Sequence, residues 1–206
     1  MKTQNSLILI MSCLMLSLLS GCSSNNVESM KYYSLNLPVD DSRMMRSEGK
    51  VRVVIDDIEL PQFLKQDNLV IQLDDQEIYT ASYNRWAEPL EVAISKLLVT
   101  QLNSEDEKFR YERSAGEWNR GAAVHPRIEF SEFHHKKTGD AVIAGRLWVY
   151  DNDKSPIIDR SFHFQEPLAE DGYAQVVVAL RNGLSKVSSE IVRLMRNNLD
   201  SNIEID

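Results

Sequence analysis

The stretch DAVIAGRLWVY (residues 140–150) decides the fold class. Its alternate residues form two sets, Ala141 to Val149 and Val142 to Tyr150, and both sets are largely apolar. A strand with this composition lies in the interior of a sheet, next to other strands and under a covering layer. The stretch therefore predicts a central strand in a sheet that is covered on one face.

Two further runs with strand-like alternation flank this stretch, at residues 123–134 and 157–165. Turn signals separate the three runs: KTGD (137–140) on one side and DNDKSP (151–156) on the other. Strands joined by such short turns pair in antiparallel fashion. The three runs therefore predict an antiparallel meander.

The first half of the chain contains more short strands. Alternation and β-branched residues predict a strand at 51–58, and runs at 69–73 and 77–81 flank Asp74-Asp75-Gln76 with hairpin spacing. Shorter strands are expected at 32–37 and 109–112. The loop between residues 40 and 50 shows no periodicity.

Two segments change to the period of a helix. Residues 88–103 place apolar side chains on one face, with Trp86 and Leu90 at its start, and Pro89 suits the first turn. Residues 171–198 repeat the pattern in a longer helix. The chain is thus predicted to be α+β, a mostly antiparallel β-sheet with two principal amphipathic helices packed on it.

The N-terminus has the features of an export signal. Its apolar run, residues 7–19, is shorter than the roughly 20 residues that a membrane-spanning helix needs. The order Leu19-Ser20-Gly21-Cys22 resembles the lipobox of bacterial lipoproteins, which implies cleavage before Cys22 and a lipid on its sulfur. The alternative is an ordinary signal peptide with an incidental cysteine. Ser23 replaces the aspartate that retains lipoproteins in the inner membrane, so the expected location is the outer membrane, facing the periplasm.

This interpretation divides the chain into a lipoprotein signal peptide (1–21), a lipidated cysteine with a polar tether (22–30), one α+β domain (31–199) and a frayed tail (200–206). The only cysteines are Cys13 and Cys22, so no disulfide is expected in the domain. The formal net charge of −8 and the lack of a basic stripe argue against nucleic acid as a partner.

Several stretches resemble one family, the PqiC-like ABC-type transport auxiliary lipoproteins. They are KYYSLNLP (31–38), IELPQFLKQDNLVIQ (58–72), WAEPLEVAISKLLVTQL (86–102) and the stretch from GRLWVY to SSEIV (145–192). They cover nearly all of the predicted domain in the family's order, and WAEPL is the most specific of them.

The resemblance implies a protein that is not an enzyme and needs no cofactor. It implies a homo-oligomer, held at the outer membrane by its lipid, that docks an MCE-domain (mammalian cell entry) partner in intermembrane lipid transport and supports envelope integrity. An alternative is an assembly or chaperone lipoprotein that binds a β-barrel protein or a lipid by itself. A lipid-modifying hydrolase is a third hypothesis, but the sequence has no GxSxG motif to supply its nucleophile.

Five apolar residues are candidates for partner binding: Leu60, Pro61, Phe63, Leu64 and Trp86. Large apolar side chains in a loop either contact a partner or cap the core, and both alternatives stand. Trp86 has the same two interpretations, a core residue or an interface hot spot. The acidic hairpin, residues 74–77, is expected to orient a partner through charge.

Neither a metal site nor a catalytic site is predicted. His134 and His135 are adjacent, so on a strand they point to opposite faces, and no third ligand lies at zinc-like spacing. The aspartate pairs at 56–57 and 74–75 are interpreted as turn and edge charges rather than as paired catalytic carboxylates.

Overall fold

The computed structural model describes residues 28–36, 51–114 and 121–199. The predicted signal peptide, Cys22, the predicted loop at 40–50 and the tail at 200–206 lie outside the described residues. None of the helices in the described part of the chain is both long and apolar enough to cross a membrane. The elements are β1 (Lys31–Tyr33), β2 (Val51–Ile55), η2 (Gln62–Leu64), β3 (Asn68–Gln72), β4 (Ile78–Trp86), α2 (Leu90–Glu105), β5 (Phe109–Arg113), β6 (His125–Lys136), β7 (Asp140–Tyr150), β8 (Pro156–Pro167) and α3 (Tyr173–Leu199).

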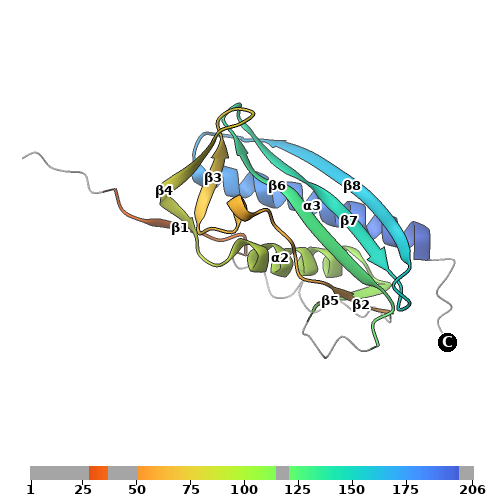
Figure 1. Cartoon of the computed structure of the whole chain (residues 1–206). Helices are drawn as coiled ribbons and strands as arrows, with labels where there is room; N and C mark the ends of the chain where they lie inside the picture. The colour runs from red at the N-terminus through yellow and green to blue at the C-terminus, as the bar shows by residue number, and fades with distance from the viewer. Residues whose placement is uncertain (1–27, 37–50, 115–120, 200–206) are drawn as a thin grey trace, which may run out of the picture.

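The fold is a twisted sheet with both helices on one side (Figure 1). Six strands follow the order β1-β4-β3-β6-β7-β8, and β2 and β5 form a separate parallel pair. The predicted meander is confirmed, since β6, β7 and β8 pair in antiparallel fashion, and so is the β3–β4 hairpin. The α+β class is confirmed, with three parallel pairings, β1–β4, β3–β6 and β2–β5, added to it.

Strand β7 is an interior strand, paired with β6 on one side and with the edge strand β8 on the other, and two glycines allow close packing around it. A Cβ added at Gly145 would lie 2.2 Å from the backbone oxygen of Glu129 on β6 and 2.7 Å from the Phe162 ring on β8. A Cβ added at Gly183 of α3 would lie 2.1 Å from Cδ1 of Ile143 on β7. Because Gly183 has no side chain, α3 can pack directly against Ile143 of β7.

The two helices lie beside each other, and α3 covers β6, β7 and β8. The apolar face of α3 is buried along its length, including Leu180, Leu184, Val187 and Ile191. The amide nitrogen of Gln101 on α2 donates a hydrogen bond to the Ser185 hydroxyl on α3 at 2.6 Å. The core therefore joins both helices to the concave face of the sheet.

The helix prediction needs one correction at its start. Trp86 is the last residue of β4, and α2 begins only at Leu90. The stretch is held extended because Tyr33 of β1 pairs with Trp86, and the Tyr33 carbonyl accepts a hydrogen bond from the Ala87 N–H at 2.8 Å. Sequence periodicity cannot reveal this pairing, because β1 lies far away in the chain.

The segment after β1 is fastened to the body of the domain. Leu35 is fully buried. The side-chain amide of Asn36 donates hydrogen bonds to the Glu88 carboxylate at 3.1 Å and to the Ala93 carbonyl at 3.0 Å. The described chain therefore enters the fold along β1, and the residues directly after β1 are fixed to the core and to the start of α2.

Candidate docking surface

Four of the five candidate residues lie in the loop at 60–67. The chain pairs with β6 both before and after this loop. Before the loop, Glu59 forms a parallel bridge with Glu129 of β6. After the loop, Ile71 of β3 pairs in parallel with His135 of β6. Residues 60–67 bulge out between these two points and include the short helix η2. The loop therefore fills the opening where β3 and β6 separate.

The loop places its apolar side chains in different surroundings. Leu60 is 5% exposed and Leu64 is 2% exposed, whereas Pro61 and Phe63 are half-buried. The Phe63 ring meets the His134 ring edge to face, with centroids 6.1 Å apart. A hydrogen bond of 2.6 Å from the Gln66 amide to the Phe63 carbonyl fixes the turn. Two of the four candidates therefore cap the core, and two lie at its surface.

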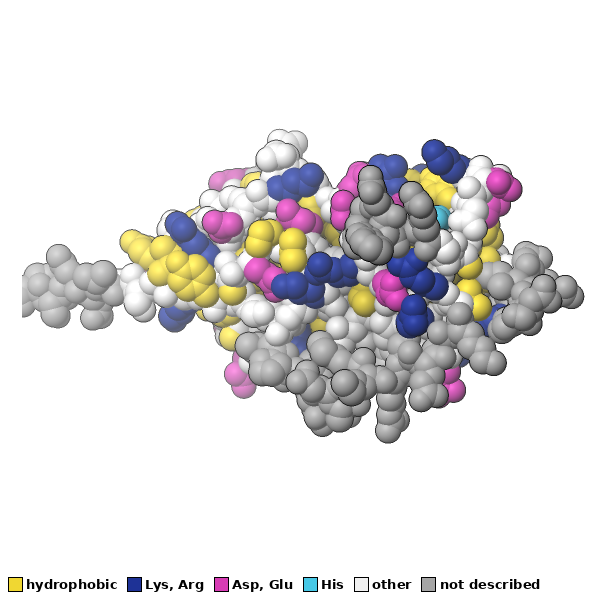
Figure 2. Space-filling model, turned by 90° about the horizontal axis from the view of Figure 1, so that it is seen from below, with side chains coloured by type: hydrophobic (Ala, Val, Ile, Leu, Met, Phe, Trp, Pro, Cys, Tyr) yellow, Lys and Arg dark blue, Asp and Glu magenta, His cyan; other side chains and the backbone are white. Residues whose placement is uncertain are grey.

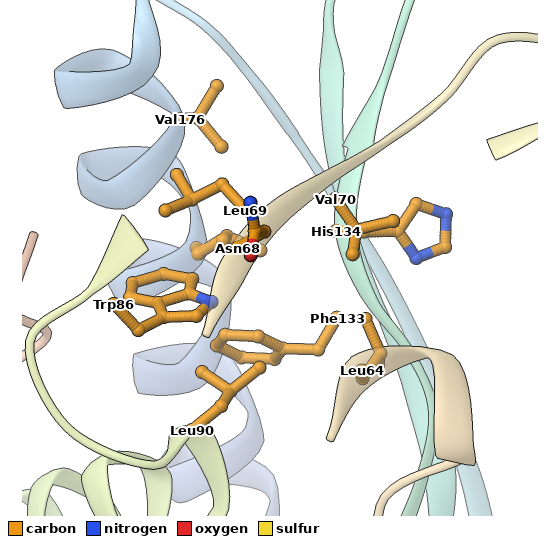
Figure 3. Close-up of a pocket in the computed structure, with 10 residues that line it drawn as sticks. Leu64, Asn68, Leu69, Val70, Trp86, Leu90, Phe133, His134 and Val176 are labelled. Carbon is orange, nitrogen blue, oxygen red and sulfur yellow. The ribbon is translucent and has the colours of Figure 1, made fainter. Parts of the chain in front are cut away.

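Trp86, the fifth candidate, is 6% exposed and lies inside the same region (Figure 3). Its indole lies near Leu90 and the Phe133 ring, with Leu64 on the far side of Phe133. The cavity that these residues help to line measures about 10 Å³, roughly the space of one water molecule. This burial agrees with the interpretation of Trp86 as a core residue, and the cavity is too small for a lipid.

The acidic hairpin is an exposed turn with a fixed backbone shape. The Asp74 carboxylate accepts hydrogen bonds from the backbone N–H groups of Gln76 at 2.8 Å and Glu77 at 2.9 Å. Beside it, the Lys137 N–H at the β6–β7 turn donates to the Gln72 carbonyl at 2.8 Å. The hairpin therefore presents negative charge in a fixed shape at one end of the sheet.

The two adjacent histidines have separate environments. His134 is buried, and its Nε2 lies 3.2 Å from Oε1 of Gln72. Burial lowers the pKa of His134 below its usual value. His135 lies on the other face, where its Nδ1 is 3.2 Å from the Asp140 carbonyl and burial again lowers the pKa. Within residues 28–36, 51–114 and 121–199, no group of three metal-ligating side chains is close enough to hold an ion.

The aspartate pair at 56–57 lies at the end of β2. Asp56 is half-buried and Asp57 is exposed. Burial raises the pKa of Asp56, against the opposing effect of His125 and Arg127. The Asp56 N–H donates to the Pro126 carbonyl at 2.9 Å, so the backbone there continues the pairing of this segment with β6.

Sequence reasoning overlooked a second surface feature, a group of exposed aromatic side chains on β1 and β4. Tyr32 is 64% exposed and Tyr83 is 45% exposed. The predicted strand at 77–81 stopped before Tyr83, whereas β4 runs from Ile78 to Trp86. The tyrosines in YTASYNRW (79–86) are the signal that could have extended it.

Comparison with known proteins agrees with this fold and gives it a context. A family model described as the ABC-type transport auxiliary lipoprotein component matches residues 33–192. Two curated proteins from Escherichia coli (strain K12) and Shigella flexneri, both named intermembrane transport lipoprotein PqiC, are each 24% identical over 175 residues. The alignment covers 85% of this chain and 90% of each relative.

Solved structures share the architecture. A crystal structure of a protein from Xanthomonas campestris has a TM-score of 0.66 at 16% sequence identity, covering 84% of this chain and 100% of that chain. At this identity the likeness concerns the fold alone. The family match, in contrast, runs from β1 to α3, through all the elements that build the sheet, the loop and the helices.

Proposed function

The chain belongs to the family of ABC-type transport auxiliary lipoprotein components, and from this membership we propose that it is an outer-membrane-anchored accessory of an MCE-type intermembrane lipid transport system. It is an auxiliary lipoprotein of a transport system. The proposed role in an MCE-type intermembrane system is supported by the match over residues 33–192, together with two relatives whose name refers to intermembrane transport.

The proposed anchor is a lipid on Cys22. The apolar run before it, the small residues at 20–21 and the polar tether after it support this assignment. Ser23 supports the outer membrane as the location. Several acyl chains, at about 0.8 kcal/mol per buried CH₂, anchor a protein far more firmly than one chain does.

The proposed action is docking rather than catalysis, by a homo-oligomer that binds an MCE-domain partner and so supports envelope integrity. The partner surface in this proposal consists of the accessible side of the 60–64 loop and the acidic hairpin. Pro61 and Phe63 supply partly exposed apolar area, and Leu60, Leu64 and Trp86 hold that loop in place from the core. The carboxylates of the hairpin steer the encounter.

Charge reversal of the hairpin tests the docking step. Replacement of Asp74, Asp75 and Glu77 by Lys is expected to slow association with the purified MCE partner at least tenfold in low salt, measured by surface plasmon resonance. Asp153→Lys is the control, because Asp153 is exposed at the β7–β8 turn, at the opposite end of the sheet. Equal association rates for wild type, the hairpin variant and the control would remove the hairpin from the proposed surface.

A Cys22→Ala variant tests the anchor separately. It is expected to leave the outer-membrane fraction and to incorporate no labelled fatty acid, because the described residues contain no helix able to cross a membrane. Unchanged outer-membrane fractionation with full labelling would refute lipidation at this cysteine.

A further inference from the structure

The exposed large hydrophobic side chains of the described residues are concentrated on two neighbouring strands. Tyr32 lies on β1 and Met30 directly precedes that strand. Three more lie on β4: Ile78, Tyr79 and Tyr83. The remaining one, Val178, lies on α3. Figure 2 shows hydrophobic side chains gathered at the end of the molecule where the described chain begins. This clustering differs from the scattered exposed apolar residues that are normal on a protein surface.

The register of the sheet defines which of these side chains share a face. Tyr32 of β1 pairs with Arg85 of β4. Side chains two residues apart on a regular strand point the same way, so Met30 lies with Tyr32. Tyr83 comes two residues before Arg85, where the register between β3 and β4 shifts, and it is 45% exposed. These four residues form what we call the entry patch. Ile78 and Tyr79 lie farther along β4, next to the hairpin, and are not part of it.

The neighbouring residues point the other way and hold the strand in place. The Tyr33 hydroxyl donates a hydrogen bond to the Asn84 carboxamide oxygen at 3.0 Å. The Tyr33 ring also packs against Tyr173 at the start of α3, with centroids 6.4 Å apart. The entry patch is therefore presented on a fixed strand pair, with its aromatic rings directed away from the core.

The length of the tether limits how far the entry patch can lie from the membrane. From Cys22 to Met30 there are eight residues, which span at most about 29 Å when fully extended. A lipid on Cys22 therefore keeps the start of β1 within about 29 Å of the bilayer surface. This step rests on the lipidation that belongs to the proposed function.

The chemistry of the patch suits a lipid surface. Tyrosine is enriched at the boundary of membranes and water, where its ring contacts apolar groups and its hydroxyl stays hydrated. Arg85 is half-buried, with its Nε buried, and it adds a positive charge at the border of the patch. We infer that the entry patch rests on the headgroup layer of the membrane that holds the lipid anchor, which sets the orientation of the domain on that surface.

The lack of other cysteines makes this inference directly testable. Cys13 leaves with the predicted signal peptide and Cys22 carries the lipid, so a cysteine introduced at position 32 or 83 can be labelled alone. Full-length processed lipoprotein with Tyr32→Cys or Tyr83→Cys is labelled with a small fluorophore and reconstituted into phosphatidylethanolamine–phosphatidylglycerol vesicles containing headgroup-nitroxide lipid. Val178→Cys is the matched control, because Val178 is 47% exposed and lies on α3.

At least twofold stronger quenching at positions 32 and 83 than at position 178 is expected. Equal quenching at all three positions would overturn the inference. A blue shift at position 32 that rises with protein concentration in lipid-free detergent would also overturn it, by assigning the patch to a second copy of the chain. Failure of the protein to float with vesicles is a separate result, which refutes the lipid anchor and with it the premise of the inference.

Discussion

Replacing Leu64 by Ala should destabilise the domain strongly, while replacing its neighbour Phe63 by Ala should do little. Leu64 is 2% exposed and borders the cavity of about 10 Å³ beside Trp86. The substitution removes three carbons, at about 0.8 kcal/mol each, and leaves a void that joins the existing cavity. We expect a loss of about 3 kcal/mol from the free energy of unfolding.

For a domain of this size, each kcal/mol shifts the melting temperature by roughly 2–4 °C, so Leu64→Ala should lower it by roughly 6–12 °C. Phe63 is only half-buried, and its loss should cost about 1 kcal/mol. Lys65→Ala is the control, since Lys65 is the next residue and is exposed. Circular dichroism of the detergent-solubilised protein measures all three.

Equal melting temperatures for Leu64→Ala and Lys65→Ala would refute the assignment of Leu64 to the core. A large loss for Phe63→Ala would contradict its placement at the surface. The expected order of stability separates the two functions of the loop, because a surface variant that folds normally can then be used to measure partner binding alone.

Three further predictions follow from the core. Leu180→Asp should prevent folding or cost several kcal/mol, measured by denaturant titration, because it places an unpaired charge at a position that is 1% exposed. Gly183→Ala should lower the melting temperature, and adding Ile143→Val should recover part of the loss because it removes Cδ1, the atom 2.1 Å from the new Cβ; no recovery would contradict this contact. The lowered pKa of His134 means that the unfolded chain binds more protons, so its contribution to stability is retained above about pH 6.5 and falls as the pH drops through that value. His134→Gln should therefore lose less stability than wild type between pH 7.5 and 5, by thermal melts at each pH.

The sequence predicts those parts of the fold whose signals are local. The alternation of β7, the turns on either side of it and the helical period of α3 all lie within short stretches, so the meander, the β3–β4 hairpin and the long helix could be predicted. The parallel pairings of β1 with β4 and of β2 with β5 join segments far apart in the chain and leave no turn signal between them. For the same reason, the sequence places Trp86 in line with the apolar face of the predicted helix at 88–103, whereas in the structure it ends β4.

The candidate site shows the same limit at the level of single side chains. Phe63 and Leu64 are adjacent, equally apolar and part of one motif, and yet one is half-buried and the other lies in the core. The difference depends on the turn of η2 and on the opening between β3 and β6 that it fills. The entry patch likewise depends on a pairing between distant segments, because β1 is the edge strand of the sheet and pairs with β4.

The way in which the chain enters the fold along β1 also has a mechanical consequence. If the proposed lipid anchor is pulled, it transmits its load to the domain through this strand. β1 runs parallel to β4 over three residue pairs, so a pull along the axis of β1 loads the hydrogen bonds between them in shear. Leu35, which follows β1, is fully buried and resists being drawn out of the core. Under tension β1 would detach from β4 before the strands of the meander separated. The rest of the sheet would then keep its shape.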